Sequence, residues 1–176
     1  NQMFAKGVFR SGIPVSPKNI FPSNIQGLPT WFEIRASAKG YLGRKAGIDF
    51  MVAMNPQSYN QDVAELNSGG YLLYDSSWKR DFNREDINII EVPLTALCVE
   101  EFPNPKTRLL FKNLVYVGAL SNLMKINKNI FIELIHEQFQ GKEKLIAPNI
   151  QALELGFAYA EKNLKDACDI SVKEED

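Results

Sequence analysis

The sequence predicts an α/β fold, a layered Rossmann-like domain with a mostly parallel (mixed) sheet and a helical C-terminal third. A near-continuous apolar run over residues 48–54 is followed by a helical segment and by a second strand-like run over residues 71–75. That order is typical of a βαβ unit. From residue 107 onward, apolar residues recur at spacings of three, four and seven, which indicates helices that bury one face.

The N-terminal segment is expected to form a helix, because its apolar residues recur at helical spacing and Gly12 follows as a stop. These apolar residues are Phe4, Val8 and Phe9. Residues 13–16 favour a short strand, and Pro14 and Pro17 restrict it to a sheet edge or to the first residues of a strand. A second strand is predicted over residues 31–37, where alternation places Glu33 and Arg35 on one face.

Between these two strands lies a loop over residues 19–29 that is rich in amides and hydroxyls. Gly27 lets a ligand or backbone approach closely, and the loop prolines reduce the freedom lost on binding. This composition favours a polar ligand or a partner's backbone over proton transfer. A self-satisfied Ω-loop is the alternative. The candidate binding residues are Asn19, Ser23, Asn24, Gln26, Gly27 and Arg35, and Arg44 and Lys45 would complete a small cationic rim.

The middle of the chain is expected to continue the βαβ pattern. A strand buried on both faces over residues 48–54 leads to a helix that Gly69 and Gly70 end, and strands follow over residues 71–75 and 87–92. The charged segment over residues 76–86 is predicted to be a surface excursion anchored by Trp78 and Phe82.

The C-terminal third is expected to hold three helices, the first over residues 107–125, the second over residues 129–140 and the last opened by Pro148. In the first helix Gly118 indicates close approach to a neighbour. Its predicted core residues are Leu110, Leu114, Val117 and Met124. The predicted boundaries are an α/β domain over residues 1–164 and an acidic tail over residues 165–176.

Composition narrows the classes of function. With 20 Lys and Arg against 21 Asp and Glu, the net charge of −1 favours neither nucleic acid nor an anionic membrane as partner. No stretch approaches the roughly 18 to 20 apolar residues of a membrane span, and we expect a cytoplasmic protein. Cys98 and Cys168 stand 70 positions apart without a metal-binding spacing, so structural thiols are expected and a metal site is not.

Candidate catalytic groups are few. His136 is the only histidine and lies inside a predicted helix, where a structural or partner-facing role is favoured over catalysis. Asp49 lies within a predicted buried strand and Asp75 at the end of a predicted strand. Strand ends are where such sheets place their ligands, but an aspartate that ends a strand can also cap a helix or turn. Motifs for a nucleophilic serine, a zinc protease or a phosphate loop are absent. We therefore expect no catalytic residue in this chain.

Several segments of the chain occur in an order typical of one known family. They are residues 12–31 (GIPVSPKNIFPSNIQGLPTW), Arg35, residues 49–55 (DFMVAMN), residues 69–75 (GGYLLYD), residues 92–93, residues 112–118 and residues 139–149. This series resembles the gamma domain of the 2-oxoacid:ferredoxin (acceptor) oxidoreductases. The resemblance is strongest to the gamma domain at the N-terminus of the alpha subunit in 2-oxoglutarate-type enzymes, and it extends from Asn1 to about Leu164.

The resemblance implies a noncatalytic part of a larger enzyme. Such enzymes decarboxylate a 2-oxoacid on thiamine diphosphate with magnesium, pass electrons through iron-sulfur clusters to ferredoxin, and release an acyl-coenzyme A. The resemblance implies that the cofactors lie in the alpha and beta domains and that this chain contributes to assembly and to coenzyme A binding. Residues 19–29 with Arg35 would then face either the coenzyme or the neighbouring domain.

Two departures from the family pattern follow from the resemblance. Family members begin with a strand and a glycine-rich turn ahead of the helix that starts here, and an alpha-type part follows the gamma domain. A separate subunit, an excised domain and a fragment all fit this difference. The alternative function is an independent α/β module that binds a nucleotide-like ligand without catalysis, and an autonomous enzyme would require Asp49, Asp75 or His136 to be catalytic.

Overall fold

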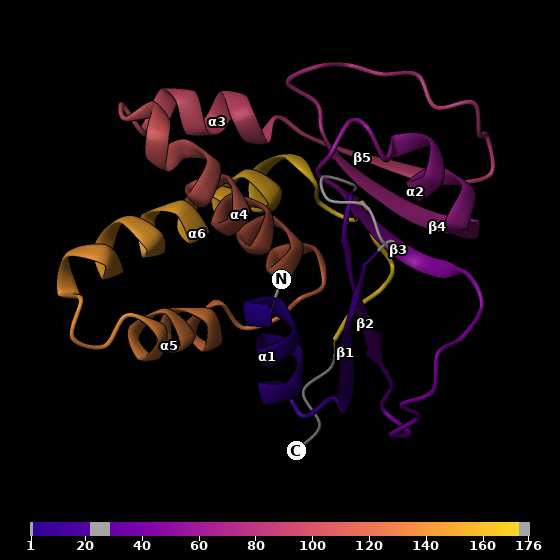
Figure 1. Ribbon diagram of the computed structural model, residues 1–176, viewed down its shortest axis with the longest axis horizontal. Helices are drawn as coiled ribbons and strands as arrows, with labels where there is room; N and C mark the ends of the chain where they lie inside the picture. Colours follow the sequence, from indigo (N-terminus) through magenta and orange to yellow (C-terminus); the bar gives the residue numbers. More distant parts are fainter. Residues whose placement is uncertain (1, 22–28, 173–176) are drawn as a thin grey trace. The chain divides into compact units, whose positions relative to one another are not determined.

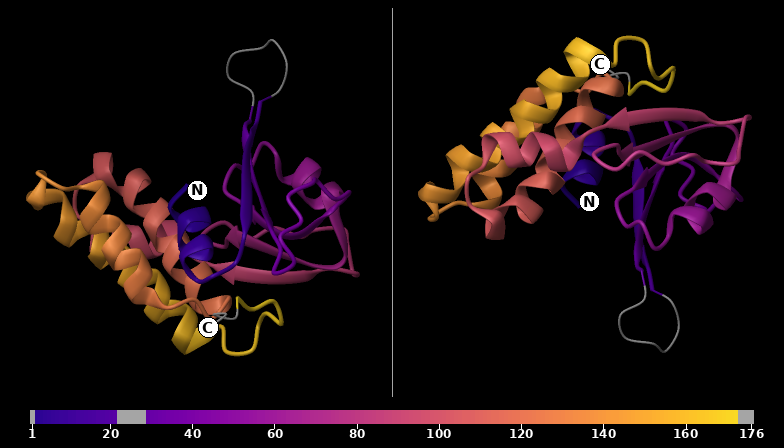
Figure 2. Two further views of the ribbon diagram at one scale, coloured as in Figure 1. Left: turned by 90° about the horizontal axis from the view of Figure 1, so that it is seen from below. Right: turned by 90° about the horizontal axis from the view of Figure 1, so that it is seen from above.

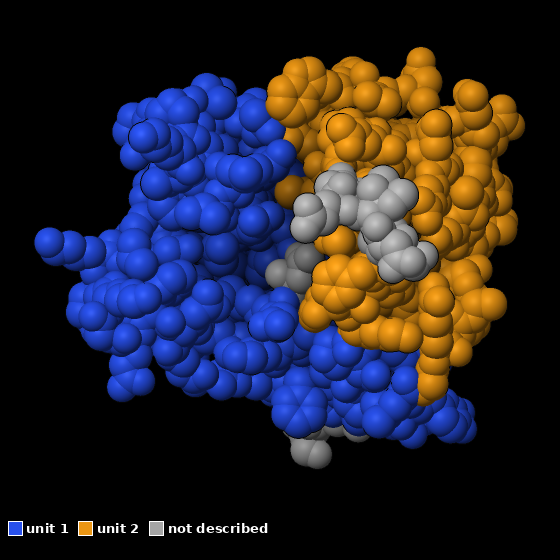
Figure 3. All heavy atoms as spheres, viewed as in Figure 1, with its two compact units in different colours: residues 1–17, 34–42, 94–176 blue, residues 18–33, 43–93 orange. Residues whose placement is uncertain are grey.

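The computed structural model describes residues 2–21 and 29–172, which form two compact units coloured separately in Figure 3. Unit 1 comprises residues 1–17, 34–42 and 94–176, and unit 2 comprises residues 18–33 and 43–93. Most of the described helices lie in unit 1, whereas the parallel sheet and one short helix lie in unit 2.

Unit 2 is built on a three-stranded parallel sheet in the order β3-β4-β5 (Figure 1). The strands are β3 (Ile48–Ala53), β4 (Leu66–Asp75) and β5 (Asn88–Val92), and α2 (Tyr59–Glu65) connects the first two. The predicted βαβ unit and the predicted α/β fold class are therefore confirmed.

One face of the sheet packs against α2. Leu72 and Tyr74 of β4 are fully buried there, together with Tyr59 and Val63 of the helix. Phe82 joins them, with its ring centroid 5.0 Å from that of Tyr74. This confirms Phe82 as an anchor of the excursion. Trp78 is 62% exposed, so its predicted anchoring role is wrong.

The glycine pair of β4 does not end a helix, contrary to the prediction. The strand starts at Leu66, opposite Ile48, and the pairing resumes at Tyr71 opposite Phe50. The intervening residues form a bulge, where Gly69 adopts a φ of +77° that side chains other than glycine rarely accept. A glycine pair predicts a helix end and a bulge equally well, because both positions require a positive φ that glycine adopts easily.

Strand β3 is only partly buried, and its expected burial on both faces is wrong. Of its residues only Ala53 is buried, and Asp49 is exposed. Since β3 pairs only with β4 among the described strands, it is an edge strand. Its apolar sequence predicted the strand correctly and its position in the sheet incorrectly.

A separate two-stranded sheet is formed by β1 (Val15–Ile20) and β2 (Trp31–Ala36). Strand β2 confirms the predicted strand after the polar loop. Strand β1 extends further than predicted and includes Pro17, which is tolerated because this small sheet has no central strand.

The described helices of unit 1 are α1 (Gln2–Arg10), α3 (Leu94–Glu101), α4 (Pro105–Leu123), α5 (Lys128–Gln138) and α6 (Glu143–Asn163). Helices α4 and α6 lie side by side in Figures 1 and 2. Gly118 of α4 and Gly156 of α6 face the other helix so closely that an added Cβ would overlap the carbonyl oxygens of Leu153 and Val115. The predicted close approach at Gly118 is confirmed.

Two predicted details of unit 1 are wrong. Leu110 is 64% exposed, although its spacing predicted burial, and Phe9, one position off the Phe4–Val8 spacing, is also 64% exposed. Pro148 lies inside α6, which begins at Glu143. Proline has no N–H to donate within a helix. Next to Pro148, the side chain of Asn149 donates a hydrogen bond of 2.6 Å to the Leu145 carbonyl oxygen, which satisfies an acceptor in the same turn.

The segment after α6 is partly packed. Cys168 is 8% exposed, and the Val172 N–H donates to the Met124 carbonyl oxygen at 2.8 Å. The predicted boundary at residue 164 follows the end of α6 and stays a prediction, while residues 173–176 lie outside the described residues. No described helix is both long enough and apolar enough to span a bilayer.

Candidate functional site

The structure places two of the six predicted binding residues. Asn19 is exposed on β1, and Arg35 is half-buried on β2. The other four, Ser23, Asn24, Gln26 and Gly27, lie outside the described residues. The described part of the candidate site therefore consists of β1 and β2, the strands that enter and leave the predicted loop.

The strand that leaves the loop is fixed to α2 by a buried carboxylate. The indole Nε1 of Trp31 donates to Asp62 Oδ1 at 2.7 Å, and the Ser58 hydroxyl donates to Asp62 Oδ2 at 2.9 Å. Asp62 is 2% exposed. Burial raises the pKa of Asp62, and its hydrogen bonds to Trp31 and Ser58 oppose that rise. Trp31, two residues after the end of the predicted loop, is therefore held in place by α2 within unit 2.

Asp62 was not predicted as a site residue. One acidic residue inside a short helix usually faces solvent, so its position alone gives no signal. Trp31 gives a weak one, because a half-buried indole N–H generally needs an acceptor. A carboxylate in the helix after the next strand is a suitable acceptor.

Arg35 contains a buried nitrogen that lacks a partner. Its Nε is buried and makes no hydrogen bond with any group in the described part of the chain. Buried donors are nearly always satisfied in folded proteins. A guanidinium in this condition suits an anionic group supplied from outside the described residues.

The predicted cationic rim is only partly available. Arg44 Nε lies 3.1 Å from Glu33 Oε2, close enough for an ion pair but not oriented as a hydrogen bond. Arg44 is thus partly neutralised by Glu33, whereas Arg35 has no ion pair with a carboxylate of residues 2–21 or 29–172. Among the three predicted cations, Arg35 is the strongest candidate for an anionic ligand.

The two candidate aspartates lie at opposite ends of the strands of the parallel sheet. Asp49 is near the start of β3, where it accepts a hydrogen bond of 2.8 Å from Asn67 Nδ2. Asp75 ends β4, is 3% exposed, and accepts a hydrogen bond from the Ser77 N–H at 3.2 Å. Ligands of such sheets bind at the carboxyl ends of the strands, whereas Asp49 lies near the amino end of its strand. The Asp75 contact supports the turn-capping alternative.

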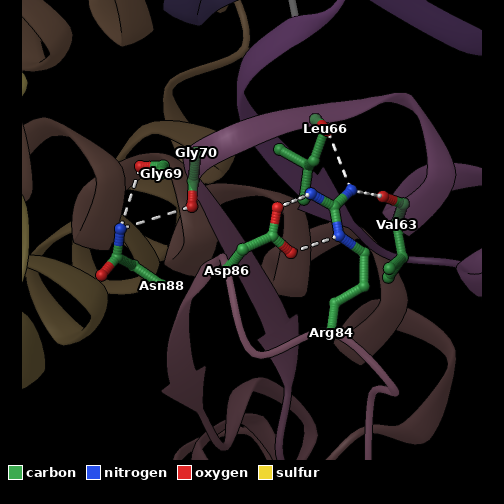
Figure 4. Close-up of polar contacts among 7 residues, drawn as sticks. All are labelled: Val63, Leu66, Gly69, Gly70, Arg84, Asp86 and Asn88. Atoms are coloured by element: carbon green, nitrogen blue, oxygen red, sulfur yellow. Dashed lines mark hydrogen bonds and ion pairs between the residues drawn. The ribbon is translucent and has the colours of Figure 1, made fainter.

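A polar cluster organises the amino edge of the sheet (Figure 4). The Arg84 guanidinium binds both carboxylate oxygens of Asp86, at 2.8 and 2.6 Å, and donates to the carbonyl oxygens of Val63 and Leu66 at 2.9 Å each. Its hydrogen bonds lower the pKa of Asp86 to about 2. The cluster ties the charged excursion to the end of α2, which is a structural role.

The predicted structural or partner-facing role of His136 stays a prediction. His136 is exposed on α5, next to Glu137, whose carboxylate binds Arg10 at 2.7 Å. Within the described ranges, no three or more His, Cys, Asp and Glu side chains gather as a metal site would require. Both cysteines are buried and neither is in a disulfide.

Comparison with known proteins identifies the family. The model of the pyruvate ferredoxin/flavodoxin oxidoreductase family matches residues 1–159. The chain belongs to this family. Two curated members with similar sequences are the ketoisovalerate oxidoreductase subunits VorA of Methanothermobacter marburgensis and Methanothermobacter thermautotrophicus, 26% and 30% identical over 117 and 119 residues. The match covers 66% of this chain and 24% of each relative, so the chain spans about a quarter of their length.

A solved structure of the same family covers almost the whole chain. It is the 2-oxoglutarate:ferredoxin oxidoreductase from Magnetococcus marinus with 2-oxoglutarate, coenzyme A and succinyl-CoA bound. The TM-score is 0.85 with 26% sequence identity, and the match covers 99% of this chain and 30% of that one.

Two further structures show the fold. The gamma subunit of a keto/oxoacid ferredoxin oxidoreductase from Geobacter sulfurreducens has a TM-score of 0.70 at 18% identity, over 91% of this chain and 88% of its own. The pyruvate oxidoreductase subunit PORC of Thermotoga maritima has a TM-score of 0.66 at 20% identity, over 89% of this chain and 85% of its own. The family match and the Magnetococcus structure confirm the resemblance to the 2-oxoacid:ferredoxin oxidoreductases, and these two structures show that the fold is shared.

Proposed function

We propose that this chain is the gamma component of a thiamine-diphosphate-dependent 2-oxoacid:ferredoxin or acceptor oxidoreductase. The complex would oxidatively decarboxylate a 2-oxoacid such as 2-oxoglutarate to an acyl-coenzyme A. The observation that carries the proposal is the match of 99% of this chain to 30% of the Magnetococcus chain, in a structure that holds 2-oxoglutarate and coenzyme A.

The chain is proposed to be a noncatalytic part of that enzyme, with alpha and beta domains or subunits as its partners and ferredoxin reached through the complex. Thiamine diphosphate, magnesium and an iron-sulfur cluster would be held by those partners. The donor set supports this division, because clusters are bound by cysteine thiolates and this sequence has only 2 cysteines, both buried. Thiols that form no disulfide also suit the reducing cytoplasm.

Within the complex, the chain is proposed to contribute to assembly and to coenzyme A binding. The proposed contact residues are Asn19, Ser23, Asn24, Gln26, Gly27 and Arg35. Arg35 gives this proposal its main structural support, because its buried Nε has no acceptor in the described ranges and coenzyme A carries phosphates. The Trp31–Asp62 hydrogen bond holds the strand between the loop and Arg35 in place.

Co-production with alpha-type and beta-type polypeptides tests the proposal. The expected result is one complex that contains all three parts and forms acyl-coenzyme A from a 2-oxoacid, while the isolated chain is inactive and binds coenzyme A weakly or not at all by calorimetry. Failure to co-purify in any combination would count against the proposal. Tight coenzyme A binding by the isolated chain would favour the independent ligand-binding module.

Arg35→Ala sharpens the test of coenzyme A binding. In the assembled complex, loss of a guanidinium contact to a phosphate should raise the KM for coenzyme A about tenfold or more, the equivalent of a charged hydrogen bond of roughly 1.5 to 3 kcal/mol. The KM for the 2-oxoacid should stay the same. Lys18→Ala, on the exposed part of β1, is the matched loss of one cation. Equal behaviour of the two variants would exclude a specific role for Arg35.

A further inference from the structure

Two leucines of α4 face solvent in a helix whose apolar pattern predicts burial. Leu109 is 68% exposed and Leu110 is 64% exposed. Later in the same helix, Val117 and Leu120 are at most 4% exposed. A helix that is apolar on several sides is normally covered on those sides. The first turns of α4 therefore have an apolar surface that the described part of the chain does not cover.

The preceding helix adds to this surface. Val99 of α3 is 49% exposed, and α3 packs directly against α4 (Figure 1). We call residues 94–111 of this helix pair the α3–α4 corner. Three large aliphatic side chains are thus exposed within residues 94–111, whereas exposed apolar groups on soluble proteins are normally scattered singly. These side chains have no hydrogen-bonding groups, so the corner does not suit a polar ligand.

The α3–α4 corner is held rigidly. Arg108 donates from Nε to the Phe102 carbonyl oxygen at 2.7 Å and from Nη2 to the Pro103 carbonyl oxygen at 3.2 Å. The rings of Phe102 and Phe111 pack with centroids 4.4 Å apart. Asn104 caps α4 by accepting from the Lys106 N–H at 3.0 Å. A surface fixed in advance loses little conformational entropy on binding.

We infer that the α3–α4 corner is the surface on which the alpha-type part of the oxidoreductase docks, an inference that rests on the proposed function. In the Magnetococcus enzyme the match covers 30% of the chain, which leaves 70% of the same polypeptide as additional protein. A further protein part is thus available in a relative to cover an apolar surface. Besides the exposed aliphatic side chains, the corner carries exposed charges such as Glu100 and Lys106, and interfaces combine apolar and charged groups in this way.

The test uses the double variant Leu109→Ser/Leu110→Ser, with the chain and the alpha-type part produced as separate polypeptides. Removing two apolar side chains from the centre of an interface should raise the dissociation constant at least tenfold, the change that about 1.4 kcal/mol produces. Calorimetric binding measures it. Phe9→Ser is the matched control, because Phe9 is equally exposed but lies on α1, and it should leave the dissociation constant unchanged.

Each other outcome is decisive for the inference. Equal affinity of the double variant and the wild type would overturn it, as would an equal loss in Phe9→Ser. A wild-type dimer in sedimentation that the double variant abolishes would assign the corner to a second copy of this chain and would also overturn it. If the wild type binds no alpha-type part, the proposed function itself fails. An unchanged unfolding midpoint of the double variant shows that any loss of affinity is not a loss of folding.

Discussion

The two units are stabilised by different kinds of contact. In unit 1 the helices α4 and α6 approach until backbone touches backbone at Gly118 and Gly156. In unit 2, beside the apolar core between the sheet and α2, polar groups attach β2 and the charged excursion to α2, through the Trp31–Asp62 hydrogen bond and the hydrogen bonds of Arg84. Unit 1 should therefore be sensitive to added volume, and unit 2 to the loss of a hydrogen-bonding group and to pH.

Gly156→Ala should produce the largest effect. Alanine is the better helix former by roughly 1 kcal/mol, so helix propensity alone predicts stabilisation. The structure predicts the reverse, because the added methyl group overlaps the Val115 carbonyl oxygen and the helices must separate. We expect a loss of about 3 kcal/mol in the free energy of unfolding, measured by denaturant titration.

Gly43→Ala is the control for Gly156→Ala. A Cβ at Gly43 has no atom within 4 Å in the described part of the chain, and Gly43 is not among the glycines with positive φ. Its stability should change by less than about 1 kcal/mol. A stabilised Gly156→Ala variant would show that the helix crossing is looser than the structure indicates.

Trp31→Phe tests the buried polar contact of unit 2. Phenylalanine keeps most of the aromatic body but leaves Asp62 without its indole donor, which should cost about 1 to 2 kcal/mol. Because the pKa of Asp62 is raised in the folded state, this group stabilises the fold below its ordinary pKa, and that contribution is lost as the pH rises through the folded pKa.

The difference between wild type and Trp31→Phe should grow over the same pH range, because the missing hydrogen bond favours the ionised carboxylate. Introducing Asp62→Asn into both backgrounds should remove the pH dependence of that difference. A difference that stays constant with pH would mean that Trp31 acts through packing alone.

Asp86→Asn should give the smallest effect. The pKa of Asp86 is lowered from 3.8 to about 2 by its hydrogen bonds with Arg84, so the pair stabilises the fold above pH 3.8 and the contribution disappears as the pH falls toward 2. Both side chains are partly exposed, and solvent weakens such pairs. Asp86→Asn should slightly lower the unfolding midpoint above pH 3.8 and should reduce the change of the midpoint as the pH falls toward 2. Asp81→Asn, at an exposed neighbouring position, should do neither.

Much of the fold could be predicted from the sequence because the pattern of β3, α2, β4 and β5 is local. The position of α3 could not, since its residues lack a polar face and follow Val92 and Pro93 directly. The start of β4 was missed because a bulge closed by Gly69 depends on pairing with β3, a contact between residues distant in sequence. The exposure of Leu110 was missed because periodicity reports an apolar face and not what covers it.

For the candidate site, the sequence located Arg35 on a strand that the structure confirms. It could not show that the Nε of this side chain is buried without an acceptor, because burial depends on residues from other segments. It also missed Asp62, whose role requires Trp31 to lie 31 positions away in sequence and 2.7 Å away in space. Local patterns identified candidates, and tertiary packing determined which of them are constrained.

The placement of the aromatic residues gives the molecule a built-in pair of optical reporters. Both tryptophans, Trp31 and Trp78, belong to unit 2, one hydrogen-bonded to Asp62 and the other largely exposed. All helices longer than α2 belong to unit 1. Indole emission therefore follows one unit, while far-ultraviolet circular dichroism mostly follows the other. Superimposable melting curves from the two signals would mean that both units unfold as one cooperative body, and separated curves would mean that each melts alone.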